Sequence, residues 1–202
     1  MAYIADTDFY AFSGVSATDT TVSSDEITLI IGRAQKFVEE YTGRVFESTS
    51  DNESIRYYTW RDDVEDLTLY LDDDLNTVAS ITAGTDTIAT SDYVTEPRND
   101  KPYYALTLKQ ESAKVWTDAT SDGDYENAIQ VNAQWAYSST APADIKYATL
   151  LLVRYMYNRS RLTDVTADRP VVLESGAVIQ AADFPRDILA ILDHYKRMEI
   201  VS

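Results

Sequence analysis

The spacing of apolar residues changes twice along this 202-residue chain. It has a helical period near the N-terminus, a period of two through the middle, and a helical period again in the last third. The first helical stretch begins at Ser23, which is followed three positions later by Glu26, and Gly43 is suited to end it. Its apolar stripe consists of Ile27, Ile30, Ile31, Ala34, Phe37, Val38 and Tyr41. The pattern predicts one amphipathic helix over residues 23–43.

A short aromatic segment precedes this helix. Residues 6–12 combine two aspartates with three aromatic residues, and Gly14 follows them. The segment predicts a short helix whose aromatic side chains pack back onto the longer one.

From Phe46 to Tyr137, polar and apolar residues alternate. Such alternation predicts an antiparallel sheet with one buried and one solvated face. Strand-like runs cover residues 55–60, 67–71, 78–82, 104–109 and 128–137, with turn signals at residues 72–74, 83–85, 97–100 and 121–124. We expect a β-module of five or six strands.

Helical spacing returns after Pro142. Residues 143–159 are apolar on most of the helix circumference, so this helix is predicted to be central in the fold or to pack partly against a neighbouring subunit. Residues 160–184 predict a loop or hairpin with two short β-branched runs. A last helix is predicted from Pro185 to about Met198.

These elements predict an α+β fold. Residues 1–45 and 138–202 form a small bundle of three to four helices, and residues 46–137 form an acidic antiparallel β-module inserted into it.

Bulk composition is that of a folded protein, with 45% apolar and 25% charged residues. There is no cysteine, which excludes disulfide frameworks and thiolate chemistry. The N-terminus has no signal-peptide pattern, and no run approaches the roughly 20 apolar residues that a membrane span needs. We therefore expect a soluble protein without a secretion signal or membrane contact.

Negative charge gathers in the middle of the chain. The formal net charge is −17, and residues 45–140 carry 19 acidic against 6 basic side chains, whereas residues 141–202 carry eight of each. Because phosphate is repelled by such a surface, direct binding of duplex DNA is disfavoured. Solubility and avoidance of DNA remain as uses for the charge.

The residues available for catalysis are few. His194 is the only histidine and lies off the main apolar line of the last helix, so a surface role is favoured for it. No nucleotide-binding, serine-hydrolase or zinc-protease motif occurs. Acid clusters at residues 62–66, 72–74 and 122–126 contain oxygen ligands suited to Ca²⁺ or Mg²⁺, but solvated turns explain them better. We assign no catalytic, cofactor-binding or metal-binding residue.

Three segments, taken in order, resemble the tailed-phage head-to-tail connector (adaptor) family. Residues 30–44 are similar to the opening helix of that family and end in Tyr-Thr-Gly-Arg. Residues 141–159 follow its pattern of a proline, an acid, Ile-Lys and an apolar run that closes in Tyr-x-Asn-Arg. Residues 185–197 resemble its terminal helix. With the insert between them, these segments span most of the chain.

The resemblance implies a structural, non-enzymatic virion protein without a cofactor. Its copies are expected to assemble in the host cytoplasm and to form a ring, expected to be a dodecamer, in the neck between capsid and tail. The implied partners are the portal protein on one side and a stopper or tail-completion protein on the other. DNA would pass through the channel of the ring without specific binding.

The resemblance also assigns roles to two helices. Portal binding is predicted for a set in the last helix, namely Ile188, Leu192, Tyr195, Lys196, Arg197 and Met198. Within this set the apolar members are expected to pack, while Lys196 and Arg197 meet acidic groups of the portal. Besides an ordinary core role, subunit packing is predicted in helix 143–159 for Leu151, Tyr155 and Tyr157.

Three other functions stay open at this point. The tyrosines and tryptophans of the insert suit a tail-associated carbohydrate or receptor-binding module. The 34 acidic residues could include a carboxylate pair of glycosidase type. An acidic surface can also mimic DNA, although its concentration on one module argues against a continuous phosphate-like track.

Overall fold

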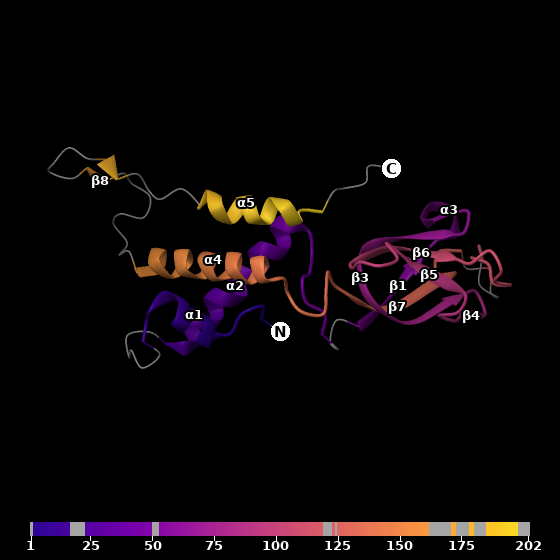
Figure 1. Ribbon diagram of the computed structural model, residues 1–202, viewed down its shortest axis with the longest axis horizontal. Helices are drawn as coiled ribbons and strands as arrows, with labels where there is room; N and C mark the ends of the chain where they lie inside the picture. The colour runs from indigo at the N-terminus through magenta and orange to yellow at the C-terminus, as the bar shows by residue number, and fades with distance from the viewer. Residues whose placement is uncertain are drawn as a thin grey trace. The chain divides into compact units, whose positions relative to one another are not determined.

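The computed structural model describes residues 2–16, 23–49, 53–118, 123, 125–161, 171–172, 178–179 and 185–197 (Figure 1). The chain forms two compact units, one of Met1–Gly43 with Pro142–Ser202 and one of Arg44–Ala141. We call them the helical unit and the β unit. The chain leaves the helical unit after residue 43 and returns to it at residue 142, so the β unit is an insertion. The predicted α+β class with an antiparallel β-module is confirmed.

The helical unit contains four helices. They are α1 (Asp6–Ser13), α2 (Ser24–Thr42), α4 (Ala143–Arg161) and α5 (Arg186–Tyr195). Helix α4 contacts each of the other three. Its wide apolar circumference is therefore explained by a central position within the unit.

The ends of α2 follow the predicted signals. The side chain of Ser23 accepts a hydrogen bond from the amide of Asp25, which satisfies an otherwise free N–H of the first turn. At the other end Gly43 has φ +66°, and its N–H donates to the carbonyl of Glu39. This left-handed conformation strains a residue with a Cβ, so glycine is required where the helix stops.

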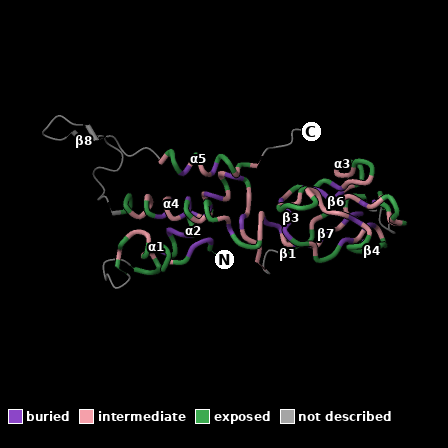
Figure 2. Tube along the Cα trace, in the orientation of Figure 1, coloured by how far each residue is buried: buried purple, intermediate pink, exposed green. Residues whose placement is uncertain are grey.

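Each helix contributes buried apolar side chains to the core of the helical unit. Its fully buried side chains include Phe9, Ile27, Ala34, Val38, Ile145, Leu152, Ile188 and Leu192 (Figure 2). The predicted short helix α1 is present, and two of its aromatic rings contact rings of α4. The rings of Phe9 and Tyr157 lie 5.4 Å apart, and those of Phe12 and Tyr147 lie 6.1 Å apart.

The β unit is built on one antiparallel sheet in the order β1-β7-β3-β6-β5, with β2 and β4 also paired to β3. The strands are β1 (Glu53–Tyr58), β2 (Val64–Glu65), β3 (Thr68–Ala83), β4 (Asp86–Ile88), β5 (Tyr93–Glu96), β6 (Tyr103–Leu108) and β7 (Ile129–Trp135). Strand β7 alternates as predicted, with Ile129, Val131, Ala133 and Trp135 buried. These side chains join one continuous apolar core inside the unit.

Strand β3 corrects one sequence prediction. Residues 72–74, expected to form a turn between two strands, lie inside a single strand of 16 residues. Before these aspartates, Tyr70 pairs with Ala105 of β6. After them, Leu75 pairs with Tyr103 of β6 and with Trp135 of β7. The pairing of β3 with β6 shifts its register between Tyr70 and Leu75. The three aspartates therefore occupy a bend at which one strand changes its main neighbour.

Other local predictions were partly wrong. Trp60, expected at the end of a strand, begins the one-turn helix α3 (Trp60–Asp63). Strands β2, β4 and β5 were missed because each is at most four residues long. The turn predicted at residues 83–85 is present, with Gly84 at φ +60° between β3 and β4.

Residues 160–184 lie mostly outside the described part of the chain, as do residues 121–122 and 124. Within residues 160–184 the structure describes β8 (Val171–Val172) and β9 (Val178–Ile179), which pair antiparallel. Among the described helices, none is long and apolar enough to cross a lipid bilayer.

Candidate functional site

The described residues assemble no site of a recognisable enzymatic kind. His194 is exposed on α5, beside the ring of Tyr195. In the acid cluster at residues 62–66, Asp63 accepts from the amide of Thr59 at 2.7 Å, and Glu65 accepts from the hydroxyl of Tyr70 at 3.3 Å. Within the described ranges, no three histidine or acidic side chains are placed to hold a metal ion. Of the cluster at residues 122–126, Asp122 and Asp124 lie outside the described residues.

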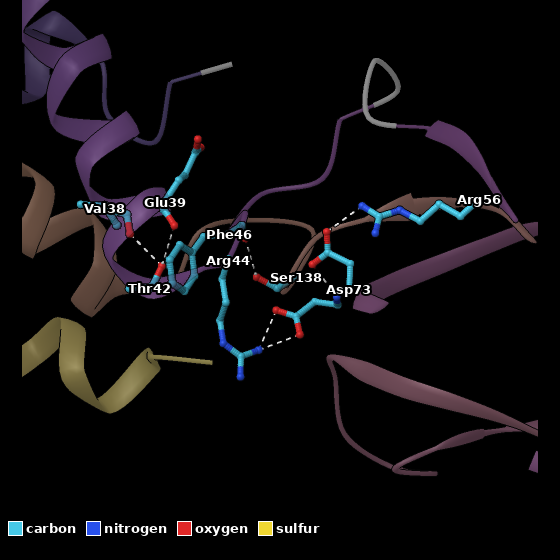
Figure 3. A network of polar contacts seen from close by, with 9 residues as sticks. Val38, Glu39, Thr42, Arg44, Phe46, Arg56, Asp73 and Ser138 are labelled. Carbon is cyan, nitrogen blue, oxygen red and sulfur yellow. Dashed lines mark hydrogen bonds and ion pairs between the residues drawn. The ribbon is translucent and has the colours of Figure 1, made fainter. Parts of the chain in front are cut away.

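The most elaborate polar arrangement surrounds the bend of β3. Arg44, the first residue of the β unit, directs Nη1 at both carboxylate oxygens of Asp74, at 2.7 and 2.6 Å (Figure 3). Asp74 is buried, so this is an ion pair largely removed from water. The guanidinium also lies 5.5 Å from the ring centre of Tyr137. Arg44 thus joins the start of the unit to its longest strand.

A second arginine neutralises the other two aspartates. Arg56 of β1 contacts Asp73 at 2.7 Å (Figure 3). It also contacts Asp72 at 2.8 Å. Its guanidinium lies 4.5 Å from the ring centre of Trp135. Because a planar cation is held between two carboxylates and an aromatic face, its position is well defined. We call Arg44, Arg56 and residues 72–74 the arginine–aspartate cluster.

The hydroxyl of Tyr58 completes the cluster by donating to Asp72 at 2.6 Å. Partial burial raises the pKa of Asp72, but hydrogen bonds from Tyr58 and Arg56, together with the charge of Arg56, outweigh burial and lower it below its ordinary value. Burial and the bond to Asp72 raise the pKa of Tyr58, so this phenol stays protonated and continues to donate.

The lowered pKa of Asp72 predicts a pH effect on the stability of the β unit. A carboxyl whose pKa is depressed by folding stabilises the fold above its unfolded pKa, and that stabilisation is lost as pH falls through the folded pKa. The free energy of unfolding, measured with urea, should therefore decrease more steeply in the wild type than in Asp72→Asn as the pH is lowered from about 6 to about 3. Tryptophan fluorescence measures the transition. Equal pH slopes in the two proteins would contradict this assignment.

The two chain passages that bound the β unit are joined close to this cluster. The amide of Tyr137 donates to the carbonyl of Val45 at 2.8 Å, and that of Ser48 donates to the carbonyl of Ser138 at 2.9 Å. Phe46 is fully buried, with its ring 5.6 Å from that of Tyr137. These contacts hold the segment that enters the β unit against the segment that leaves it.

The residues predicted to bind a portal lie on helix α5 and directly after it. Ile188 and Leu192 are fully buried in the helical unit, as expected for the apolar members of the set. Their part in portal binding stays a prediction. Tyr195 is half-buried and Lys196 is exposed. Met198 lies outside the described residues.

The end of α5 is fastened to the end of α2. The amide of Arg197 donates to the carbonyl of Thr42 at 2.8 Å, which satisfies a carbonyl that α2 leaves free. The hydroxyl of Tyr41 donates to Asp193 at 2.5 Å, and the ammonium of Lys196 lies 5.4 Å from the ring centre of Tyr41. These contacts fix the direction in which the chain leaves α5.

The residues predicted for subunit packing are half-buried on α4. Tyr157 packs against Phe9, and the hydroxyl of Tyr155 accepts a hydrogen bond from Arg159 at 3.2 Å. Leu151 is half-buried as well. Subunit packing by these side chains stays a prediction.

The chain matches a known protein family over almost its whole length. The sequence model of the family described as head completion protein matches residues 2–198. The chain belongs to the head completion protein family. The match spans both passages of the helical unit and the whole β unit, and it includes all three segments on which the resemblance to head-to-tail connectors depends. That resemblance is confirmed.

Solved structures of gene transfer agent particles contain chains with a similar fold. A chain in the neck of an empty gene transfer agent particle, computed with C6 symmetry, has a TM-score of 0.61 and 13% identity, covering 96% of this chain and 90% of that one. A chain in the virion of a native gene transfer agent particle has a TM-score of 0.59, 14% identity and the same coverages. At these identities the likeness shows a common fold. No curated protein sequence matches the chain.

No sequence pattern indicates the arginine–aspartate cluster. Arg44 and Asp74 are 30 positions apart, and Arg56 and Asp73 are 17 positions apart, so no local pattern links them. Only the pairing of β1 with β7 and the bend of β3 bring these side chains together.

Proposed function

We propose that this head completion protein is a structural subunit of the neck of a phage-like particle, without enzymatic activity. Copies form a ring beneath the portal and connect it to a stopper or tail-completion protein. The observation that carries the proposal is the family match over residues 2–198. The fold likeness to chains in the neck and virion of gene transfer agent particles supports the location.

The charge of the β unit supports a passage for DNA. Residues 44–141 carry 19 acidic and 7 basic side chains, a formal net charge of −12. Two of those bases, Arg44 and Arg56, are paired within the arginine–aspartate cluster. A ring of such subunits would repel the phosphates of DNA in its channel, so that DNA could pass without adhering.

The exposed end of α5 is proposed as the portal contact. Because Ile188 and Leu192 are buried, they support the helix from within, and the contact is assigned to exposed charge such as Lys196. A cation at this place would meet acidic groups of the portal. Truncation of α5 would also remove two core side chains, so a single charge reversal is the better test.

Mixing the purified chain with portal protein of the same particle tests this proposal. Electron microscopy should show a ring of copies, expected to be twelve, at one end of the portal. Lys196→Glu should weaken portal binding on the order of tenfold, because an attraction becomes a repulsion. Arg186→Glu, at the other exposed end of α5, is the matched control and should bind normally.

Several outcomes would count against the proposal. A chain that ignores portal and instead binds glycans would favour the carbohydrate-binding alternative. A chain absent from purified particles would contradict a place in the neck. Normal binding by Lys196→Glu would remove only the assignment of the portal contact to the end of α5.

A further inference from the structure

Strand β1 leaves one side of the large sheet open. It stands first in the order β1-β7-β3-β6-β5, so among the described strands it pairs with β7 alone. The backbone N–H and C=O groups on the other side of an edge strand can form a ladder with one more strand. The chemistry of this open edge therefore specifies an extended chain as its partner.

Strand β1 also lacks the features that usually protect an edge. Proteins blunt such edges with lysine, with proline or by keeping the strand very short. At the opposite edge, β5 has four residues and is followed by Pro97 and Arg98. In contrast, β1 has six residues without lysine or proline, and its Ile55 and Tyr57 are 49% and 54% exposed. This combination indicates a strand that is covered in the assembled particle.

Two other strands of the chain lack a large sheet. Strands β8 and β9 pair with each other in a sheet of their own, whereas every other described strand belongs to the large sheet. Two paired strands are at best marginally stable in water and need further strands or another packing surface. Residues 171–179 include three valines and one isoleucine, and Glu174 is their one charged side chain. Such a segment suits the edge of an acidic unit better than an acidic strand would.

The path of the helices favours a partner in another copy. The β unit is attached through residues 43 and 142, at the end of α2 and the start of α4. Helix α4 then runs for 19 residues, or about 28 Å, before it ends at Arg161. Helix α5 runs back, because the amide of Arg197 directly after it donates to the carbonyl of Thr42. The segment that carries β8 and β9 thus leaves the helical unit at the end remote from residues 43 and 142.

We propose that, in the ring, the β8–β9 pair of one copy adds to the open edge of β1 in the next copy. The inference rests on the proposed function, because a ring requires two different surfaces that engage each other on successive copies. The edge of β1 is one of these surfaces and the β8–β9 pair is the other. Main-chain hydrogen bonds supply the contact, and the exposed apolar side chains of Ile55 and Tyr57 are covered by it.

Introduced cysteines test this contact without background, because the chain has no cysteine of its own. Copies with Tyr57→Cys are mixed with copies with Val178→Cys, assembled on portal protein and treated with a short bismaleimide. Each cross-link then joins two different copies. We expect cross-linked dimers in denaturing gels from the mixture and at least tenfold fewer from rings of either variant alone. The matched control replaces Tyr57→Cys with Tyr104→Cys, on β6 and 52% exposed, which should give at least tenfold fewer dimers in the mixture.

A lysine on the edge tests whether the ring needs the contact. Tyr57→Lys should reduce the number of complete rings at least tenfold, counted by electron microscopy and mass photometry, because lysine on an edge strand opposes the addition of another strand. Tyr104→Lys makes the same change of charge at a similarly exposed site, and should give full rings. Tryptophan fluorescence during urea unfolding shows that the β unit of each variant is folded.

The outcomes separate this contact from the ring itself. Full wild-type rings whose cysteine mixture gives no dimers would overturn the contact and leave the proposed function intact, and so would full rings with Tyr57→Lys. Dimers from Tyr57→Cys copies alone would show β1 pairing with β1, which also overturns the proposal. So would a double variant, Tyr57→Cys, Val178→Cys, that cross-links only within one copy. A wild-type chain that never forms rings would end both the contact and the proposed function.

Discussion

Replacing Arg44 with alanine should lower the free energy of unfolding of the β unit by about 3–5 kcal/mol, the usual cost of leaving one member of a buried ion pair without its partner. The Asp74 side chain is only 6% exposed and lies 2.6 Å from the guanidinium. Without Arg44 this buried carboxylate loses the cation that it contacts. The loss would be a large part of the total stability of a domain of this size.

Tryptophan fluorescence during urea unfolding measures this loss in the β unit specifically. All three tryptophans, Trp60, Trp116 and Trp135, belong to residues 44–141. The control is the double variant Arg44→Met, Asp74→Leu, which removes both charges and should recover most of the stability. An unchanged urea midpoint in Arg44→Ala would show that the ion pair does not hold the bend of β3 together.

Truncating Leu192 to alanine should destabilise the helical unit by about 2–5 kcal/mol, as expected for a large side chain removed from a packed core. Leu192 is fully buried on α5, with Ile188 one turn before it. Helical circular dichroism should show earlier unfolding, while the tryptophan transition of the β unit should stay where it is in the wild type. His194→Ala, an exposed neighbour on the same helix, should shift stability by no more than about 0.5 kcal/mol.

The same experiment distinguishes two roles for α5. If Leu192→Ala lost portal binding with its helical stability unchanged, Leu192 would be a direct portal contact and its burial would be a feature of the free chain only. A loss of helical stability shows instead that the apolar side of α5 packs within the subunit.

Much of this fold could be predicted because its main signals are local and periodic. Ser23 and Gly43 mark the ends of α2 by their own chemistry, and the alternation over 129–135 needs no distant partner to be recognised. The wide apolar circumference of α4 indicated a central position or packing against a neighbouring subunit, and α4 contacts the other three helices of its unit. Strands of two to four residues offered too few positions to show any period.

The candidate sites depend on distant contacts, which is why sequence analysis found them only in part. Three consecutive aspartates favour a turn, whereas here Arg44, Arg56 and Tyr58 bind their carboxylates inside a strand. The spacing of Ile188 and Leu192 identified an apolar stripe but could not tell a partner's surface from the core of the subunit itself.

The bend of β3 also limits how the length of the chain can vary. A surface turn accepts an added or deleted residue at little cost, but residues 72–74 lie in a continuous strand, directly before the buried Leu75 and Asn76. One extra residue there would shift the pairing of all that follows in β3 with β7, unless a further bulge restored the register. Differences in length among homologous chains should therefore avoid these three aspartates and gather in loops such as residues 97–102, between β5 and β6.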